Sequence, residues 1–225
     1  MTGSARDDIL ATMRRSLGVS GTEAPRRAAV ADRLAQAPKG IVPKRADVSG
    51  AVRVALFKRQ AEEALATVTL VADAASVPGE AARYLRDANL PATLRMGQDP
   101  RLAAMPWETT ALDIAKGPSA GSDLNALSHA FAAVAETGTL AMVSGGDNPT
   151  TLNFLPDNHI VVLAAGDIAG SYEETIDRLR ARYGKGAMPR TLNLITGPSR
   201  SADIEQTLIL GAHGPRKLHI IVVEG

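Results

Sequence analysis

The sequence predicts an α/β protein with a mostly parallel central sheet, preceded by a helical arm. From about residue 50 onward, short runs of apolar and β-branched residues alternate with longer segments of helical periodicity. This alternation favours a parallel sheet with helices on its faces. The first 46 residues differ, because an amphipathic segment is followed there by a stretch rich in proline and charge. We therefore divide the chain into an arm, residues 1–46, and an α/β domain, residues 47–225.

The arm is predicted to begin with a capped helix. Ser4 is a favoured N-cap residue, and Asp7 and Asp8 place negative charge in the first turn. Apolar residues then recur at helical spacing, and Gly18 marks the expected end of the helix. The apolar positions are Ile9, Leu10, Met13 and Leu17.

Residues 18–48 are interpreted as a linker with one or two helical turns between Arg26 and Gln36. A helix as short as the first one needs a surface to pack on. Two interpretations of the arm therefore remain open: it packs on its own domain, or it docks on a partner protein.

The domain elements follow from periodicity and from β-branched content. The predicted helices span residues 50–66, 77–88 and 171–183. The predicted strands span residues 67–71, 92–95, 110–114, 131–135, 139–143, 159–163, 192–196 and 218–223. His159 precedes a buried-type strand and is interpreted as structural, whereas His129 lies at the edge of a polar segment.

Composition narrows the class of function. The chain has 25 basic and 24 acidic residues and 3% aromatics, which does not favour a nucleic-acid surface. It has no cysteine, so it cannot hold a cysteine-ligated iron–sulfur cluster or zinc ion. The polar start is not a signal peptide, and apolar runs such as residues 160–165 are too short to span a bilayer. We expect a cytoplasmic protein without membrane insertion.

A first candidate loop joins two predicted strands and reads Ala-Glu-Thr-Gly-Thr. Glu136 is placed where a tuned carboxylate acts as a base or nucleophile. Thr137, Gly138 and Thr139 supply hydroxyl groups and a position at which a ligand can approach the backbone closely. The alternative is that Glu136 only accepts hydrogen bonds from the turn.

A second candidate loop follows the strand 139–143 and contains Ser144, Gly145 and Gly146. Backbone amides in such a loop can form a nest for an anion. The loop matches neither the Walker pattern nor G-x-G-x-x-G. The alternative is a plain surface turn, because the following Asp-Asn-Pro is ordinary turn sequence.

A third candidate segment follows the strand 192–196. Gly197 opens a turn that places Ser199 and Arg200 at the edge of the sheet, and an arginine grips carboxylates or phosphates with two hydrogen bonds. His213, which lies near glycines, is a candidate acid–base group. Asp203 completes the set of expected substrate-binding residues in this segment.

A metal site is the weaker interpretation of the same region. Asp203 and Glu205 with His213 and His219 offer ligand atoms, but no two of them have a recognised local spacing. Asp203 and Glu205 are better explained as caps of backbone amides or partners of Arg200. We therefore expect no metal site.

Taken in order, these segments resemble the LUD domain of the lactate utilization protein C (LutC/YkgG) family. The resemblance is strong over residues 130–223 and looser back to Asp47. The matching stretches are residues 135–139, 155–160, and 197–205 with 211–215. The family implies a Rossmann-like α/β sheet similar to that of the NagB/RpiA/CoA-transferase group. Its members are encoded with two iron–sulfur proteins and support oxidation of L-lactate to pyruvate.

The resemblance implies a subunit of an iron–sulfur-dependent system whose substrate is a small 2-hydroxy acid. The chain itself is expected to hold no cofactor, with iron–sulfur clusters on co-encoded partner proteins, and not to be active alone. Arg200 is expected to grip the substrate carboxylate, and His213 or Glu136 to move a proton. We expect the loops at Glu136, Gly145 and Gly197 to converge into one pocket.

Two other functions remain open at this point. The first is a non-catalytic assembly or ligand-sensing subunit. The second is a CoA-dependent transferase or hydrolase with Glu136 as nucleophile, by analogy with CoA transferases of related fold.

Overall fold

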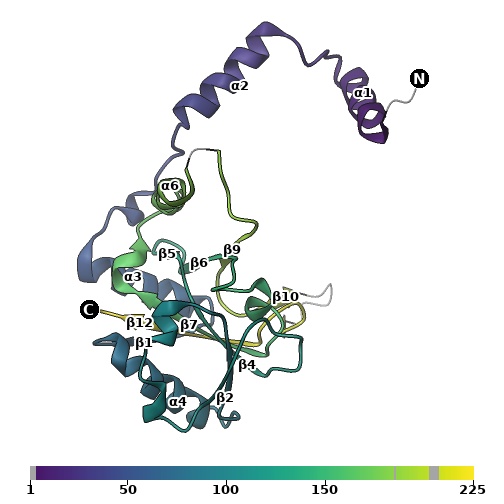
Figure 1. Cartoon of the computed structure of the whole chain (residues 1–225). Coiled ribbons are helices and arrows are strands. Elements are labelled where there is room, and N and C mark those ends of the chain that lie inside the picture. The colour runs from purple at the N-terminus through teal and green to yellow at the C-terminus, as the bar shows by residue number, and fades with distance from the viewer. Residues whose placement is uncertain (1–3, 185, 203–207) are drawn as a thin grey trace. The chain divides into compact units, whose positions relative to one another are not determined.

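The computed structural model describes residues 4–184, 186–202 and 208–225 (Figure 1). The chain divides into two compact units, Met1–Ile41 and Val42–Gly225. Within the described ranges, no helix has the length and apolar character needed to cross a membrane.

The first unit contains two helices, α1 (Ala5–Leu17) and α2 (Ala24–Gln36). The predicted caps of α1 are confirmed: the Ser4 side chain accepts a hydrogen bond from the Asp7 amide, and Gly18 is left-handed at φ 64°. Helix α2 has 13 residues and is longer than the one or two turns predicted. Pro25 at its start is compatible with a helix. Proline lacks a backbone N–H, and an N–H in the first turn would have no intrahelical acceptor.

The second unit is built on a six-stranded sheet with strand order β1-β12-β7-β4-β2-β3. Every pair of neighbouring strands in it is parallel, which confirms the predicted α/β class. The strands are β1 (Thr67–Val71), β2 (Thr93–Met96), β3 (Asp113–Lys116), β4 (Asn125–His129), β7 (Asn158–Ala164) and β12 (Lys217–Val223).

A second, four-stranded sheet has the order β8-β5-β6-β9. In it β6 is antiparallel to both β5 and β9, and β5 is parallel to β8. A separate antiparallel hairpin pairs β10 with β11. The strands are β5 (Ala132–Val134), β6 (Thr139–Val143), β8 (Ile168–Ala169), β9 (Leu192–Ile195), β10 (Arg200–Ala202) and β11 (Leu208–Leu210).

The helices of the second unit connect these strands. The α-helices are α3 (Gly50–Glu63), α4 (Val77–Asp87), α5 (Pro100–Ala103) and α6 (Tyr172–Tyr183). The 3-10 turns are η1 (Lys44–Ala46), η2 (Ala74–Ser76), η3 (Trp107–Thr109), η4 (Thr150–Asn153) and η5 (Ala165–Asp167).

The six-stranded sheet has a separate core on each face, as the alternation of side chains in a strand requires. On β12, Ile220 and Val222 pack in the cluster that contains α3 and the second sheet. Their neighbour Ile221 packs in the other cluster, with α4. Figure 1 shows α3 and the four-stranded sheet on one side of the main sheet and α4 on the other.

Strand β4 was not predicted. All five of its residues are buried between β2 and β7, although three of them are polar. The Asn125 side-chain amide donates to the carbonyls of Pro91 and Thr93, both at 3.0 Å, so its burial is compensated. His129, expected at the edge of a polar segment, instead ends this central strand. The predicted strand at 110–114 begins later, at Asp113, because η3 ends just before Thr110.

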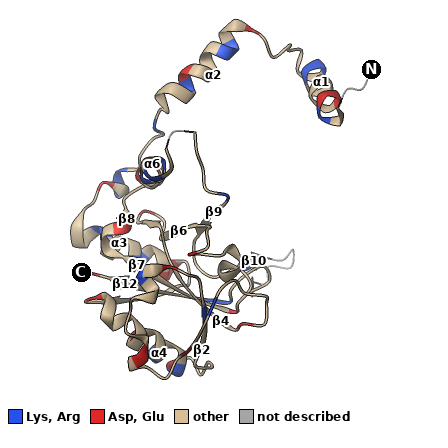
Figure 2. Ribbon diagram, viewed as in Figure 1, with Lys and Arg blue, Asp and Glu red and all other residues tan. Residues whose placement is uncertain are grey.

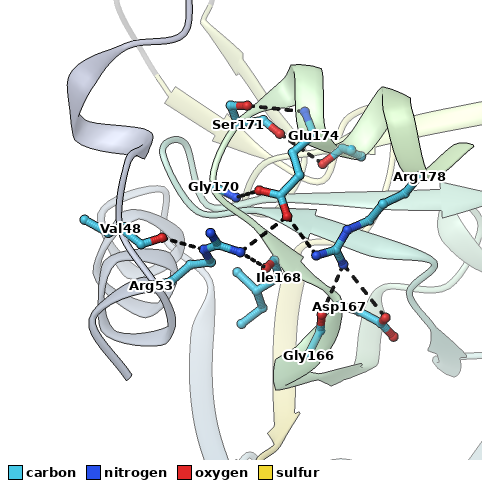
Figure 3. A network of polar contacts seen from close by, with 10 residues as sticks. Val48, Arg53, Gly166, Asp167, Ile168, Gly170, Ser171, Glu174 and Arg178 are labelled. Carbon is cyan, nitrogen blue, oxygen red and sulfur yellow. Dashed lines mark hydrogen bonds and ion pairs between the residues drawn. The ribbon is translucent and has the colours of Figure 1, made fainter. Parts of the chain in front are cut away.

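A polar network ties α3, β8 and α6 together (Figure 3). The Glu174 carboxylate lies 3.3 Å from Arg53 and 2.9 Å from Arg178, and it accepts the Gly170 amide at 2.8 Å. Arg53 also donates to the Val48 carbonyl at 2.7 Å. The network fixes the first turn of α6 against the start of α3.

Positive and negative side chains are interspersed along the domain (Figure 2). Helix α4 alone carries Glu80, Arg83, Arg86 and Asp87.

Candidate functional site

A cleft of about 260 Å³ opens at the amino-terminal ends of β7 and β12, beside the carboxyl end of β9. Its location differs from that of ligand sites in most open α/β sheets, which lie at the carboxyl ends of parallel strands. The walls come from η4, β7, β9 and two turns, residues 196–200 and 213–215. The polar lining residues are Asn153, His159, Thr196, Ser199, Arg200 and His213.

Ser199 joins the two turns. Its amide donates to the Pro215 carbonyl at 2.9 Å, and its carbonyl accepts the Gly211 amide at 2.9 Å. Its hydroxyl accepts the His213 amide at 3.3 Å. Gly197 sets the direction of the first turn, because it is left-handed at φ 70° and its backbone packs on the Ala64 carbonyl at the end of α3. Ser199, Arg200 and His213, which the sequence placed in one candidate segment, therefore line the same cleft.

Arg200 and His213 lie at the rim of the cleft, and both are exposed. Among the described residues, Arg200 makes no ion pair within 4 Å. Asp203 and Glu205, which were considered as partners of Arg200, lie outside the described residues.

The floor of the cleft contains two buried polar side chains that sequence reasoning did not assign to a site. Asn153 and His159 are each 1% exposed. His159 Nε2 lies 3.0 Å from the Ser128 hydroxyl. Burial lowers the pKa of His159 to about 3, so its ring is neutral at pH 7. The only signal in the sequence was that His159 belongs to the 155–160 stretch of the family resemblance, with Asn153 two positions before that stretch.

Three atoms of this floor have no hydrogen-bond partner among the described residues: both amide atoms of Asn153, and Nδ1 of His159. More than nine in ten buried polar groups in proteins are paired. Three unpaired atoms in one cleft are therefore a distinct feature of this site.

Glu136 does not line the cleft. Its carboxylate is buried, with Arg45 Nε at 3.7 Å, and its amide donates to the Gly170 carbonyl at 3.2 Å. Gly138, left-handed at φ 65°, brings the same turn against the backbone of Ala61 in α3. The first loop therefore faces η1 and α3.

Thr139 links the first loop to the cleft. Its hydroxyl lies 2.7 Å from that of Thr196, which lines the cleft, and 3.0 Å from the Tyr172 hydroxyl. Thr137 reaches the same group, with its hydroxyl 2.8 Å from that of Thr139. Thr139 therefore contacts Thr196 from behind the wall of the cleft, and Thr137 contacts Thr139. Neither Thr137 nor Thr139 lines the cleft itself.

The second loop lies at the opposite end of β6 and β9. Ser144 pairs with Thr191, ahead of β9, whereas Gly197 follows the end of that strand. The six residue steps from Thr191 to Gly197 span roughly 20 Å in extended conformation. The Gly146 carbonyl accepts a hydrogen bond from the Gln98 amide, and Gly145 is exposed. The expectation that all three loops form one pocket is therefore wrong.

His219 does not belong to the cleft either. It is buried on β12, with its ring stacked on Tyr84 and Nδ1 2.8 Å from the Thr67 hydroxyl. Among the residues that the structure describes, no group of three or more potential metal ligands is found.

A parallel six-stranded sheet with a second sheet on one face, and a cleft at the amino-terminal ends of β7 and β12, defines the class of protein as an α/β domain. The LUD domain family model matches residues 54–223, so the chain belongs to the LUD domain family. The family resemblance predicted from the sequence is confirmed.

Curated relatives and one solved structure agree with this assignment. Proteins named lactate utilization protein C from Geobacillus sp. (strain WCH70) and Bacillus subtilis (strain 168) are 40% and 36% identical over 91 residues. Each match spans 40% of this chain and 38% of the relative. A crystal structure of a DUF162 family protein from Deinococcus radiodurans is 26% identical and covers 78% of this chain and 99% of its own, with a TM-score of 0.58.

Proposed function

We propose that this chain acts in lactate utilization as a cytoplasmic, cluster-free subunit that binds a small 2-hydroxy acid in the cleft. One observation carries the proposal. The two turns that make the family resemblance most specific, residues 197–200 and 211–215, are joined by Ser199 and present Arg200 to the same cleft. The curated relatives named for lactate utilization supply the substrate class.

The chemistry of the rim fits a carboxylate ligand. An arginine without an ion pair among the described residues provides two parallel N–H donors, which match the two oxygens of a carboxylate. A volume of about 260 Å³ accommodates a three-carbon acid. His213, also at the rim, is placed to exchange a proton with the ligand.

Oxidation of lactate to pyruvate removes two electrons and two protons, so an electron acceptor is required. The chain has no cysteine and no G-x-G-x-x-G sequence. We place the acceptor on iron–sulfur partner proteins, which would receive the electrons while this subunit holds the acid.

Glu136 is not assigned a role in this mechanism, because its buried carboxylate faces Arg45 and not the cleft. A CoA-dependent activity with Glu136 as nucleophile requires access to that carboxylate, and its side chain is only 4% exposed. A non-catalytic assembly or sensing subunit remains compatible with a cleft that only binds the acid.

The first test is calorimetric titration of the full chain with L-lactate. We expect Arg200→Ala to weaken binding by about tenfold or more, since it removes a charge-assisted pair of hydrogen bonds. Arg59→Ala is the matched control, because Arg59 is also exposed, does not line the cleft, and pairs with Glu63 on α3. Equal binding by both variants would remove Arg200 from the site.

The second test is reconstitution. The purified chain alone should not reduce an artificial electron acceptor with lactate, and addition of the iron–sulfur partners should produce that activity. Lactate oxidation by this chain alone would contradict the assignment of the electron acceptor. Acyl-CoA hydrolysis or transfer that is lost in Glu136→Gln would favour the CoA-dependent alternative.

A further inference from the structure

Asn153 and His159 form a polar floor beneath the rim that carries Arg200. Both side chains are 1% exposed and both line the cleft. They come from different elements, Asn153 from the end of η4 and His159 from the start of β7. The short segment between η4 and β7 brings the two residues to the same cleft.

The hydrogen bond of His159 with Ser128 fixes which ring nitrogen carries the proton. Ser128 is 1% exposed, and its hydroxyl proton needs a buried acceptor. His159 Nε2, at 3.0 Å, is the acceptor that the described residues provide. With Nε2 accepting, the proton of the neutral ring lies on Nδ1, which becomes a donor without a partner in the described part of the chain.

The floor thus offers a defined set of unpaired groups. His159 Nδ1–H and the Asn153 Nδ2 protons are donors, and Asn153 Oδ1 is an acceptor. Leaving a buried polar group without a hydrogen bond costs roughly 1–3 kcal/mol. A ligand with a polar group that pairs with these atoms therefore binds more tightly than a ligand with an apolar group in the same place. A carboxylate is poorly suited to the floor, because the Asn153 acceptor would face a second negative oxygen.

We propose that Asn153 and His159 recognise the hydroxyl or carbonyl oxygen at C2 of the acid whose carboxylate is held by Arg200. This inference rests on the proposed function and adds the residues that determine specificity. A 2-hydroxyl group donates to Asn153 Oδ1 and accepts from His159 Nδ1–H. A 2-oxo group accepts from both donors. The site therefore takes lactate and pyruvate and rejects propionate, which has the same length but no oxygen at C2.

The test compares L-lactate, pyruvate and propionate as calorimetric probes of the full chain. The native protein should bind the first two at least about tenfold more tightly than propionate, since a site built to pair with an oxygen discriminates against its absence. Asn153→Leu should remove most of this preference. Arg200→Ala should weaken all three acids by a similar factor and leave the preference in place. Asn193→Leu is the matched control, because Asn193 also has an unpaired side-chain nitrogen but does not line the cleft.

A thermal measurement without any acid separates recognition from a purely structural role. Leucine has nearly the shape of asparagine and removes unpaired buried atoms, so Asn153→Leu should unfold at the native temperature or above it. A fall of more than about 4 °C would show that Asn153 stabilises the fold and would overturn the inference.

The binding outcomes are also distinct. Equal affinity for lactate and propionate in the native protein, or an unchanged preference in Asn153→Leu, overturns this inference and leaves the proposed function intact. No binding of any of the three acids overturns both.

Discussion

His219 is a buried histidine whose ionisation is set by its position in the main sheet. It lies on β12, 2% exposed, and its ring stacks on Tyr84 with the centroids 4.1 Å apart. Burial lowers the pKa of His219 to about 4, although the Glu80 carboxylate 3.3 Å away favours the protonated ring. The cost of burying the charged ring therefore exceeds the attraction of the neighbouring carboxylate.

This depressed pKa predicts a loss of stability in acid. The unfolded chain takes up the proton near pH 6.5 and the folded chain only near pH 4, so the free energy of unfolding falls as the pH drops through this window. The stability that the neutral His219 ring contributes is fully present above pH 6.5, and about 2.5 kcal/mol of it is lost by pH 4.5. His219→Phe keeps a ring on Tyr84 and removes the titration. Urea unfolding at pH 7 and pH 4.5 should show a smaller pH effect in this variant, and an identical effect would contradict the assignment.

Gly138 illustrates a residue that the fold requires to be glycine. Its φ is +65°, and a Cβ atom there would overlap the backbone of Gln60 and Ala61 in α3. Because backbone cannot move aside as a flexible side chain can, we expect Gly138→Ala to lower the free energy of unfolding by about 2–4 kcal/mol. Gly146→Ala is the control, since a Cβ atom there meets no atom within 4 Å. Chemical denaturation of the two variants side by side provides the measurement.

At the scale of secondary-structure elements, the network in Figure 3 holds α6 on the domain. One carboxylate oxygen of Glu174 faces Arg53 and Arg178, and the other accepts the Gly170 amide. A glutamine has only one acceptor oxygen, so Glu174→Gln must lose either the arginines or the amide. The side chain is 37% exposed, so solvent screens part of the loss.

We therefore expect Glu174→Gln to lower the free energy of unfolding by about 1–2 kcal/mol. Glu173→Gln in the same turn is the control, because Glu173 makes no ion pair among the described residues. Equal stability of the two variants, measured by thermal unfolding, would mean that the network contributes nothing.

At the scale of the whole molecule, the boundary between the two units gives a prediction about truncation. Residues 42–225 form a compact unit, so removal of residues 1–41 should leave its thermal transition within about 2 °C of the full chain. Removal of residues 1–48 should lower the transition by more than about 5 °C. That second cut deletes the buried Ala46 and the Val48 carbonyl, to which Arg53 donates. A large effect of the shorter cut would show that the arm belongs to the core of the domain.

Several elements could be predicted because their local sequence signals are strong. The Ser4 cap and Gly18 stop fix α1, because both act within a few residues of the backbone groups they satisfy. The β-branched runs at 67–71 and 218–223 specify β1 and β12, and alternation along β12 divides its side chains between two cores. The turns at Ser199 and His213 were also located correctly, since glycine and proline fix the backbone locally.

The burial of polar residues and the positions of loops relative to one another depend on how distant segments pack, so they could not be predicted from local sequence. Strand β4 has a polar sequence and forms because neighbouring strands and carbonyls satisfy Asn125 and Ser128, a condition that involves residues 31 or more positions away. The Ser144 loop lies apart from Gly197 because β6 and β9 are antiparallel, and strand direction is set by packing of the whole sheet. The burial of His159 depends in the same way on Ser128, a residue 31 positions away. Local sequence specifies backbone conformation, whereas the position of a side chain in a site depends on contacts between distant segments that close only when the core forms.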